Sequence, residues 1–119
     1  MRLTVLAAIV LGAGAMSACG GNSPTTPSNP TTASVSIVSG ATSLGANAYA
    51  PNPVTIAPGG TVTWVNNDTR AHTTTSDNSA FNSGTMAAGA SFSQNFPTAG
   101  TYPYHCTFHP GMVGTVTVK

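Results

Sequence analysis

Three residues near the end of the chain carry side chains that bind soft metals. Cys106, His109 and Met112 stand in a Cys-x2-His-x2-Met spacing. A thiolate and a thioether beside an imidazole suit copper better than other common biological metals. Because Pro110-Gly111 lies between the second and third donors, the three must sit on a tight loop and not on a helix. This loop brings three donors to one point, and we predict that His72 supplies the fourth.

Three further residues could be mistaken for parts of this site. His105 directly precedes Cys106, and neighbouring side chains on a strand point to opposite faces, so we expect His105 to be a partly exposed non-ligand. Met86 lies far from the loop in sequence, among small residues, and is expected to be core or surface filler. Trp64 lies within an alternating apolar run, where we expect it to be the core anchor of its strand.

The composition excludes several classes of function. The chain has 119 residues, enough for one domain, and charged residues make up only 4% of it, with a formal net charge of +1. No basic surface for nucleic acid is present. Asp68 and Asp77 are the only acidic residues, so no paired-carboxylate or Ser/His/Asp site is available. A four-ligand metal site also has no open position for a substrate. We therefore predict that the protein is not an enzyme.

The region after residue 33 consists of short runs of alternating apolar and polar residues, separated by Pro/Gly/Asn turns. This pattern predicts an all-β sandwich of seven to eight strands. Residues 41–52 and 76–90 have no strong pattern. The predicted strands cover 35–38, 53–56, 61–65, 72–76, 91–96, 101–105 and 114–118. The side chains expected on the inner faces are Val62, Trp64, Phe92, Phe96, Val116 and Val118.

The start of the chain resembles an export signal. Arg2 is followed by a short apolar run, and small residues then precede Cys19, as in a bacterial lipobox. We therefore predict a lipoprotein signal peptide over 1–18, lipidation of Cys19 and anchoring to a membrane. The alternative is an ordinary secretory signal cut near Ala13-Gly14-Ala15, which would leave Cys19 unmodified.

Residues 19–33 are rich in Pro, Thr and Ser and contain no core-forming side chain. They are expected to form a disordered tether, and residues 34–119 the folded copper-binding domain. The chain has two cysteines, one at the head of this tether and one in the predicted metal loop. A disulfide between Cys19 and Cys106 would remove a metal donor, so none is predicted.

The chain from about Tyr49 onward resembles the cupredoxins, the small blue-copper proteins related to plastocyanin and amicyanin. The loop has the short spacing of amicyanin. The resemblance rests on that loop and on Pro53-Val-Thr-Ile, Gly60-Thr-Val-Thr-Trp, Ala71-His-Thr and Ala99-Gly-Thr-Tyr. It implies a Greek-key sandwich with one type 1 copper ion at one end. His72, Cys106 and His109 would be the trigonal ligands of that ion and Met112 the weak axial ligand.

Two residues beside the predicted ligands depart from the family pattern. Many cupredoxins have Asn immediately after the first histidine, where it ties that segment to the cysteine loop, whereas this chain has Thr73. A threonine hydroxyl can make the tie with less reach. Amicyanin-like loops have Pro where this chain has Phe108, which retains a backbone N–H. We hypothesise that this N–H donates to the Cys106 sulfur and raises the reduction potential.

The function implied is one-electron Cu(I)/Cu(II) transfer at a membrane surface by an exported, periplasmic or cell-surface monomer. Electrons would pass through the edge of His109, and redox partners would dock on an apolar rim formed by Phe108, Pro110 and Val113. Two alternatives remain open. One is a periplasmic copper carrier or buffer that delivers metal. The other is a structural zinc site, which Met112 disfavours because zinc rarely takes a thioether.

Overall fold

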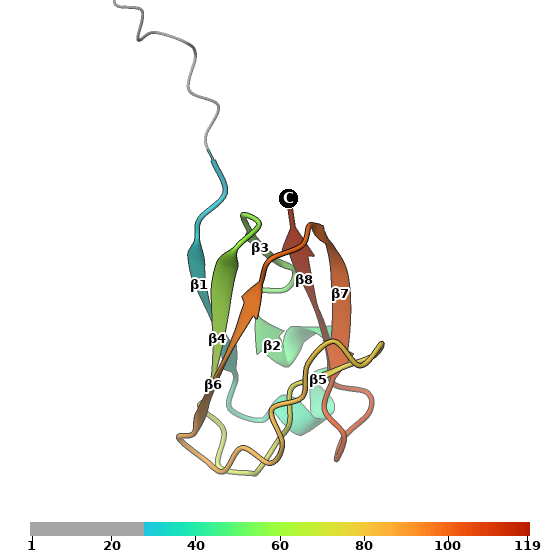
Figure 1. Ribbon diagram of the computed structural model, residues 1–119. Coiled ribbons are helices and arrows are strands. Elements are labelled where there is room, and N and C mark those ends of the chain that lie inside the picture. Colours follow the sequence, from blue (N-terminus) through green and yellow to red (C-terminus); the bar gives the residue numbers. More distant parts are fainter. Residues whose placement is uncertain (1–27) are drawn as a thin grey trace, which may run out of the picture.

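The computed structural model describes residues 28–119, which form two four-stranded sheets packed face to face (Figure 1). One sheet has the strand order β2-β1-β4-β6 and the other β3-β8-β7-β5. This two-sheet sandwich of eight strands confirms the predicted fold class. The predicted signal peptide, Cys19 and most of the tether lie outside the described residues. Within residues 28–119, no helix is long and apolar enough to cross a membrane.

The strands are short, and two 3-10 turns are the only helical elements in the described part of the chain. The turns, η2 and η3, cover Ala41–Ser43 and Gly45–Asn47. The strands are β1 Thr32–Ile37, β2 Tyr49–Ala50, β3 Val54–Ile56, β4 Gly60–Asn66, β5 Thr75–Ser76, β6 Ser91–Phe96, β7 Gly100–His105 and β8 Val113–Val118.

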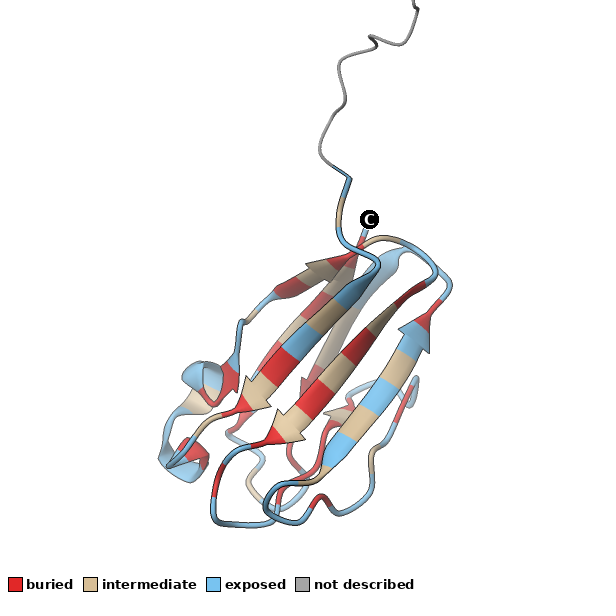
Figure 2. Ribbon diagram, turned by 90° about the vertical axis from the view of Figure 1, so that its left-hand side faces the viewer, coloured by how far each residue is buried: buried red, intermediate tan, exposed pale blue. Residues whose placement is uncertain are grey.

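The period-two pattern of the sequence appears directly as bands of buried and partly exposed residues along the strands (Figure 2). Along β4, each buried residue alternates with a half-buried one. Trp64 is fully buried at the centre of the core, with the rings of Phe81 and Phe92 stacked against it at 5.5 and 5.8 Å. Of the six predicted inner-face residues, five are buried and Phe92 is half-buried because β6 is an edge strand.

The register of β7 and β8 requires a glycine close to the predicted metal loop. These strands are antiparallel, and Tyr104 lies opposite Gly114. A Cβ atom at position 114 would lie 2.4 Å from the Tyr104 hydroxyl oxygen. The buried Tyr104 ring therefore occupies the space that any larger residue at position 114 would need.

The structure differs from the predicted elements in three places. Residues 41–52, which lacked a pattern, contain η2, η3 and the two-residue strand β2. The predicted strand 72–76 is reduced to β5, Thr75–Ser76, because the backbone around His72 pairs in an isolated bridge with Met86. The first strand begins at Thr32, inside the predicted tether, since parallel pairing with β4 uses backbone groups and needs no large side chain.

One end of the sandwich collects the loops that carry the predicted ligands. The β4–β5 connection, the η2–η3 segment and the β7–β8 loop all lie at the lower end in Figure 1. A Cβ atom on Gly45, in η3, would lie 3.8 Å from the Gly111 carbonyl, so the η3 turn borders the β7–β8 loop directly. The opposite end holds the C-terminus, where the Asn29 side chain donates to the Lys119 carbonyl at 2.7 Å.

Candidate metal centre

His72 comes from the β4–β5 connection and is fully buried. Its backbone is held by the reciprocal bridge with Met86: the His72 N–H donates to the Met86 carbonyl at 3.1 Å, and the Met86 N–H donates back at 2.8 Å. The side chain of Asn66 adds a bond to the same Met86 carbonyl at 3.0 Å. The position of His72 is therefore fixed by backbone pairing, although it lies outside the regular sheets.

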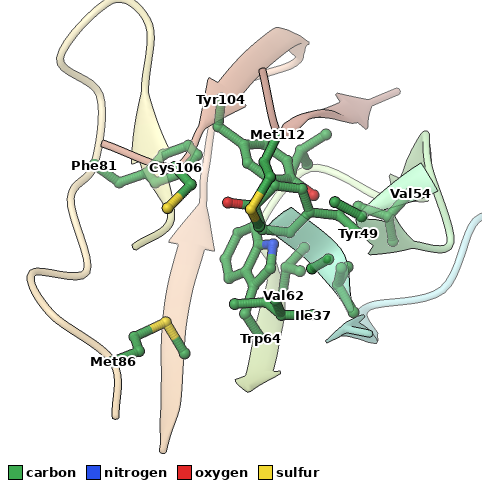
Figure 3. Packing of buried hydrophobic residues seen from close by; sticks show 14 of the residues in the cluster. Ile37, Tyr49, Val54, Val62, Trp64, Phe81, Met86, Tyr104, Cys106 and Met112 are labelled. Atoms are coloured by element: carbon green, nitrogen blue, oxygen red, sulfur yellow. The ribbon is translucent and has the colours of Figure 1, made fainter. Parts of the chain in front are cut away.

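Cys106, His109 and Met112 come from the loop between β7 and β8. The loop closes on itself, since the Met112 N–H donates to the His109 carbonyl at 2.9 Å and the Cys106 N–H donates to the Met112 carbonyl at 3.1 Å. Pro110 and Gly111 form the turn between these bonds, as predicted. Cys106 and Met112 are fully buried within the core cluster shown in Figure 3. His109 is partly exposed.

The donor atoms of three of these residues converge. The Nδ1 atoms of His72 and His109 lie 3.8 and 3.7 Å from Cys106 Sγ, and all three donor atoms lie within 4.8 Å of one another. A transition metal sits about 2.0–2.1 Å from imidazole nitrogen and about 2.3 Å from thiolate sulfur. At a trigonal angle of about 120°, those bonds separate nitrogen from sulfur by about 3.8 Å. The observed spacing fits a trigonal metal site.

Asp68 orients His72 for this role. Its Oδ2 lies 2.6 Å from His72 Nε2, and both side chains are buried. The carboxylate occupies Nε2, which leaves Nδ1 as the nitrogen available to a metal. The hydrogen bond from His72, with backbone bonds from Gly40 and Thr69, lowers the pKa of Asp68 to about 2. Asp68 is therefore ionised at neutral pH.

Thr73 links the His72 segment to the cysteine. Its N–H donates to Cys106 Sγ at 3.3 Å, and its side-chain oxygen accepts the Thr107 N–H at 2.8 Å. The buried Tyr49 hydroxyl donates to the Thr73 carbonyl at 2.6 Å. Burial raises the pKa of Tyr49, which keeps this hydroxyl protonated. These bonds tie the first ligand segment to the loop that carries the other three.

The Phe108 amide is not seen to play the role that we hypothesised for it. Among the hydrogen bonds of residues 28–119, the backbone N–H that reaches Cys106 Sγ is that of Thr73. The Phe108 side chain is 50% exposed at the tip of the loop. Donation from Phe108 to the sulfur therefore stays a prediction, whereas the Thr73 bond is an observed feature of the site.

The side chains of the residues predicted not to be ligands do not join the group of donor atoms. His105 is partly exposed, and its Nδ1 pairs with Asp77 Oδ1 at 2.5 Å. Met86 is buried, as expected for core filler, and Figure 3 shows its side chain well apart from Cys106. In the described residues Cys106 is a free thiol. Cys19 lies outside those residues.

Sequence reasoning missed Asp68, Tyr49 and Thr107. Asp68 had a usable signal, because it precedes His72 by four residues and is one of only two acidic residues in the chain. No local sequence pattern pointed to Tyr49, because its hydroxyl contacts the Thr73 carbonyl, which is 24 residues away in the sequence. Thr107 could have been noticed as the residue that follows the predicted thiolate ligand, in the same relation as Thr73 to His72.

A two-sheet β-sandwich with a His/Cys/His/Met set at one end, buried except for the partly exposed His109, defines a small copper protein of the cupredoxin class. Comparison with known proteins gives the family. Residues 35–119 match the copper-binding proteins of the plastocyanin/azurin family, and the chain belongs to that family.

Individual relatives agree with this assignment. The chain is 42% identical over 88 residues to plastocyanin from Scenedesmus fuscus, covering 63% of this chain and 90% of the relative. It is 32% identical over 126 aligned positions to amicyanin from Paracoccus denitrificans, covering 96% and 92% of the two chains.

Solved structures give the same picture. A purple cupredoxin from Nitrosopumilus maritimus superposes with a TM-score of 0.68 at 36% identity, covering 73% of this chain and 99% of the other. A reduced Cu(I) form of an amicyanin variant superposes with a TM-score of 0.61 at 31% identity, covering 74% and 82%.

Family membership and donor geometry together identify the cofactor. It is one type 1 copper ion, and its site consists of His72, Cys106, His109 and Met112. The chain is a copper-binding electron carrier like plastocyanin and amicyanin, and it is not an enzyme.

Proposed function

We propose that this protein is exported, anchored to a membrane by lipidated Cys19, and carries single electrons between partners at that membrane surface. The observation that supports the redox role most strongly is the trigonal spacing of 3.7–3.8 Å between Cys106 Sγ and the two imidazole Nδ1 atoms. Copper supplies the one-electron Cu(I)/Cu(II) couple when it is bound. The protein residues hold the donors, exclude water from three of them and leave one edge open.

The four ligands have different roles in this proposal. His72, Cys106 and His109 would hold the copper ion through two imidazole nitrogens and a thiolate, and Met112 would add a weaker thioether contact. The carboxylate of Asp68 fixes the usable nitrogen of His72, and the Thr73 N–H stabilises negative charge on the Cys106 sulfur. Because these supports come from the folded chain, the donors are positioned before the metal binds, and they move little when its charge changes.

His109 is partly exposed, whereas the other three ligands are fully buried. Electrons therefore leave through His109. The rim around it is apolar. Phe108 and Val113 are 50% and 38% exposed, and Leu44, between η2 and η3, is 39% exposed, so we include it in the proposed rim. These three are the exposed large hydrophobic residues of the described chain, and all lie in the loops of the copper end or where β8 begins. A small apolar rim suits brief docking of a redox partner.

The membrane anchor rests on the sequence of residues 1–19. A C19S substitution is expected to move the protein from the membrane fraction to the soluble fraction, because it removes the thiol that would carry the lipid. A detergent-phase separation of wild-type and C19S protein measures this directly. Equal partition of the two proteins would instead support cleavage by an ordinary secretory signal near Ala13-Gly14-Ala15.

The competing role is copper delivery by a periplasmic carrier or buffer. Two measurements on the copper-loaded protein separate the roles: voltammetry, and transfer of Cu(I) to a strong chelator. An electron carrier gives a reversible one-electron wave and releases copper slowly. Sluggish redox cycling with ready release of Cu(I) would contradict our proposal and favour the metal carrier.

A further inference from the structure

Three threonine hydroxyls form a closed ring beside the cysteine ligand. The side-chain oxygen of Thr73 lies 2.9 Å from that of Thr75 and 3.1 Å from that of Thr107. Thr75 and Thr107 are themselves 3.1 Å apart. Each hydroxyl can donate one bond and accept two, so all three contacts are compatible with hydrogen bonding around the ring.

The ring begins where the backbone pairing of β5 and β7 stops. The last paired positions are Thr75 and His105. Continuing the same antiparallel register by two residues places Thr73 opposite Thr107. No ladder pair is formed there, and the side chains make the connection instead: the Thr107 N–H donates to the Thr73 side-chain oxygen at 2.8 Å. The ring therefore extends the strand pair to the two residues that directly follow His72 and Cys106.

The members of the ring differ in exposure. Thr73 is 4% exposed, Thr75 is half-buried and Thr107 faces solvent. The inner hydroxyl is thus protected from water, while the outer two close the ring at the surface. Asn82 lies beside the ring, with its Oδ1 3.4 Å from the Thr75 hydroxyl, where it competes for the single Thr75 proton at a longer distance than the ring partners.

We propose that this ring positions the copper ligands, with Thr75 and Thr107 as positioning residues that do not touch the metal. By fixing Thr73 against Thr107, the ring holds the His72 segment at one distance from Cys106. It also keeps the Thr73 N–H directed at Cys106 Sγ, at 3.3 Å. Three short hydroxyl side chains thereby do what a single longer amide side chain does in many cupredoxins.

The variant T107V tests the ring, because valine keeps the shape of threonine and the backbone N–H of residue 107 but removes one ring hydroxyl. We expect release of Cu(I) to a chelator to become about fivefold faster, the effect of one lost neutral hydrogen bond. We also expect a lower reduction potential, because a loosened Thr73 N–H stabilises the thiolate less. T75V should act in the same direction, and T73V more strongly, by about tenfold, since it also leaves the Thr107 N–H without its acceptor.

Two matched variants separate positioning from general stability. T107S restores a hydroxyl without the methyl group and should return both readouts to wild-type values. T63V removes the hydroxyl of a comparable pair, Thr63 and Ser93 at 2.7 Å, on the β4–β6 ladder of the other sheet. It should leave the release rate and the potential unchanged.

The proposal is overturned if T107V and T75V release copper at the wild-type rate with the wild-type potential. It is equally overturned if T107S behaves like T107V, or if T63V shifts the readouts as far. If T107V does not fold, the release rates and potentials of T75V and T73V test the ring instead. T73S, which keeps the hydroxyl, is then the matched control for T73V. The release assay does not depend on electron carriage, so failure of the proposed redox function is distinguishable from failure of the ring.

Discussion

At the scale of single residues, the site depends on partners that contact the ligands and do not bind metal themselves. Asp68 is the example with the clearest chemistry. It is buried, accepts backbone bonds from Gly40 and Thr69, and contacts His72 Nε2 at 2.6 Å. A carboxylate held in this way selects which imidazole nitrogen remains for the metal.

The lowered pKa of Asp68 predicts how the stability of the metal-free protein depends on pH. The folded protein lowers this pKa from 3.8 to about 2, mainly through the hydrogen bond from His72. The ionised carboxylate therefore stabilises the fold above about pH 4, and this contribution is lost as the pH falls toward 2. Urea unfolding of the metal-free protein between pH 2 and pH 4 should show the loss.

The variant D68N keeps a hydrogen-bond acceptor for His72 but cannot ionise. Its stability should change less over the same pH range than that of the wild type. D77N, which alters the exposed partner of His105, is the matched control and should retain the wild-type pH dependence. A D68N profile parallel to the wild-type profile would show that Asp68 does not carry this contribution.

Phe108 gives a second test at this scale. A backbone N–H that donates to the thiolate favours the reduced ion, and F108P removes that N–H. If the Phe108 amide donates in the copper-loaded protein, F108P lowers the reduction potential measured by voltammetry. An unchanged or higher potential would leave Thr73 as the amide donor to the sulfur and end the hypothesis for Phe108.

At the scale of elements, the ligand loop is positioned by the segments that border it. Asn52 connects two of them, η3 and β8: its Nδ2 donates to the carbonyls of Ala46 and Val113, at 2.9 and 3.3 Å, and its Oδ1 accepts the Thr115 N–H at 2.9 Å. The start of β8, directly after Met112, is thus tied to the η3 turn. The loop is constrained on this side, as the threonine ring constrains it on the other.

The fit between β7 and β8 can be tested at Gly114. In G114A the new methyl group would lie 2.4 Å from the Tyr104 hydroxyl oxygen, so the ring must move. Overpacking of this kind costs about 1–3 kcal/mol in the free energy of unfolding, measured by urea titration. Because Tyr104 lies two residues before Cys106, near the end of β7, the copper spectrum should also change.

G100A is the matched control for this substitution, since it lies on the same pair of strands. Its new methyl group would meet the Tyr102 ring at 3.6 Å, an ordinary contact. G100A is therefore expected to keep both the stability and the spectrum within the range of the wild type. Equal losses in the two variants would mean that close packing against Tyr104 is not the cause.

At the scale of the whole molecule, the described chain carries almost no charge. Arg70 and Lys119 balance Asp68 and Asp77, and the two acidic groups are either buried or paired with histidine. Arg70 is exposed, and Lys119 lies at the C-terminal end, away from the ligand loops. No strong field is present to steer a charged partner.

This low charge predicts electron-transfer rates that depend little on salt. The rate constant with hexacyanoferrate, measured by stopped flow, should change by less than about twofold from 0.01 M to 1 M salt, over which the Debye length falls from about 30 Å to about 3 Å. The variant R70E should introduce a clear dependence, with slower reaction at low salt. A steep dependence in the wild type would contradict docking through an uncharged rim.

The sequence predicted the sandwich and three of the ligands, Cys106, His109 and Met112, because these follow from local patterns, whereas His72 lies 34 positions before Cys106 and was predicted together with the resemblance to the cupredoxins. The alternation along 61–65 and 91–96, the turn residues between the strands and the Cys-x2-His-x2-Met spacing all lie within short stretches. It did not predict β2, or the bridge that replaces strand pairing at His72, because these depend on contacts with distant segments. Tyr49 and Asn52 were missed for the same reason, since Tyr49 reaches Thr73, 24 positions away, and Asn52 reaches Val113 and Thr115, 61 and 63 positions away.

The visible spectrum of the protein loaded with Cu(II) tests the central claim most directly. A trigonal site with a thiolate ligand gives an intense charge-transfer band in the visible region, and C106S, which removes the thiolate, should abolish it. We predict a strongly coloured wild-type complex and a colourless C106S complex. A colourless wild-type complex would contradict the assignment of Cys106, His72 and His109 to a type 1 copper site.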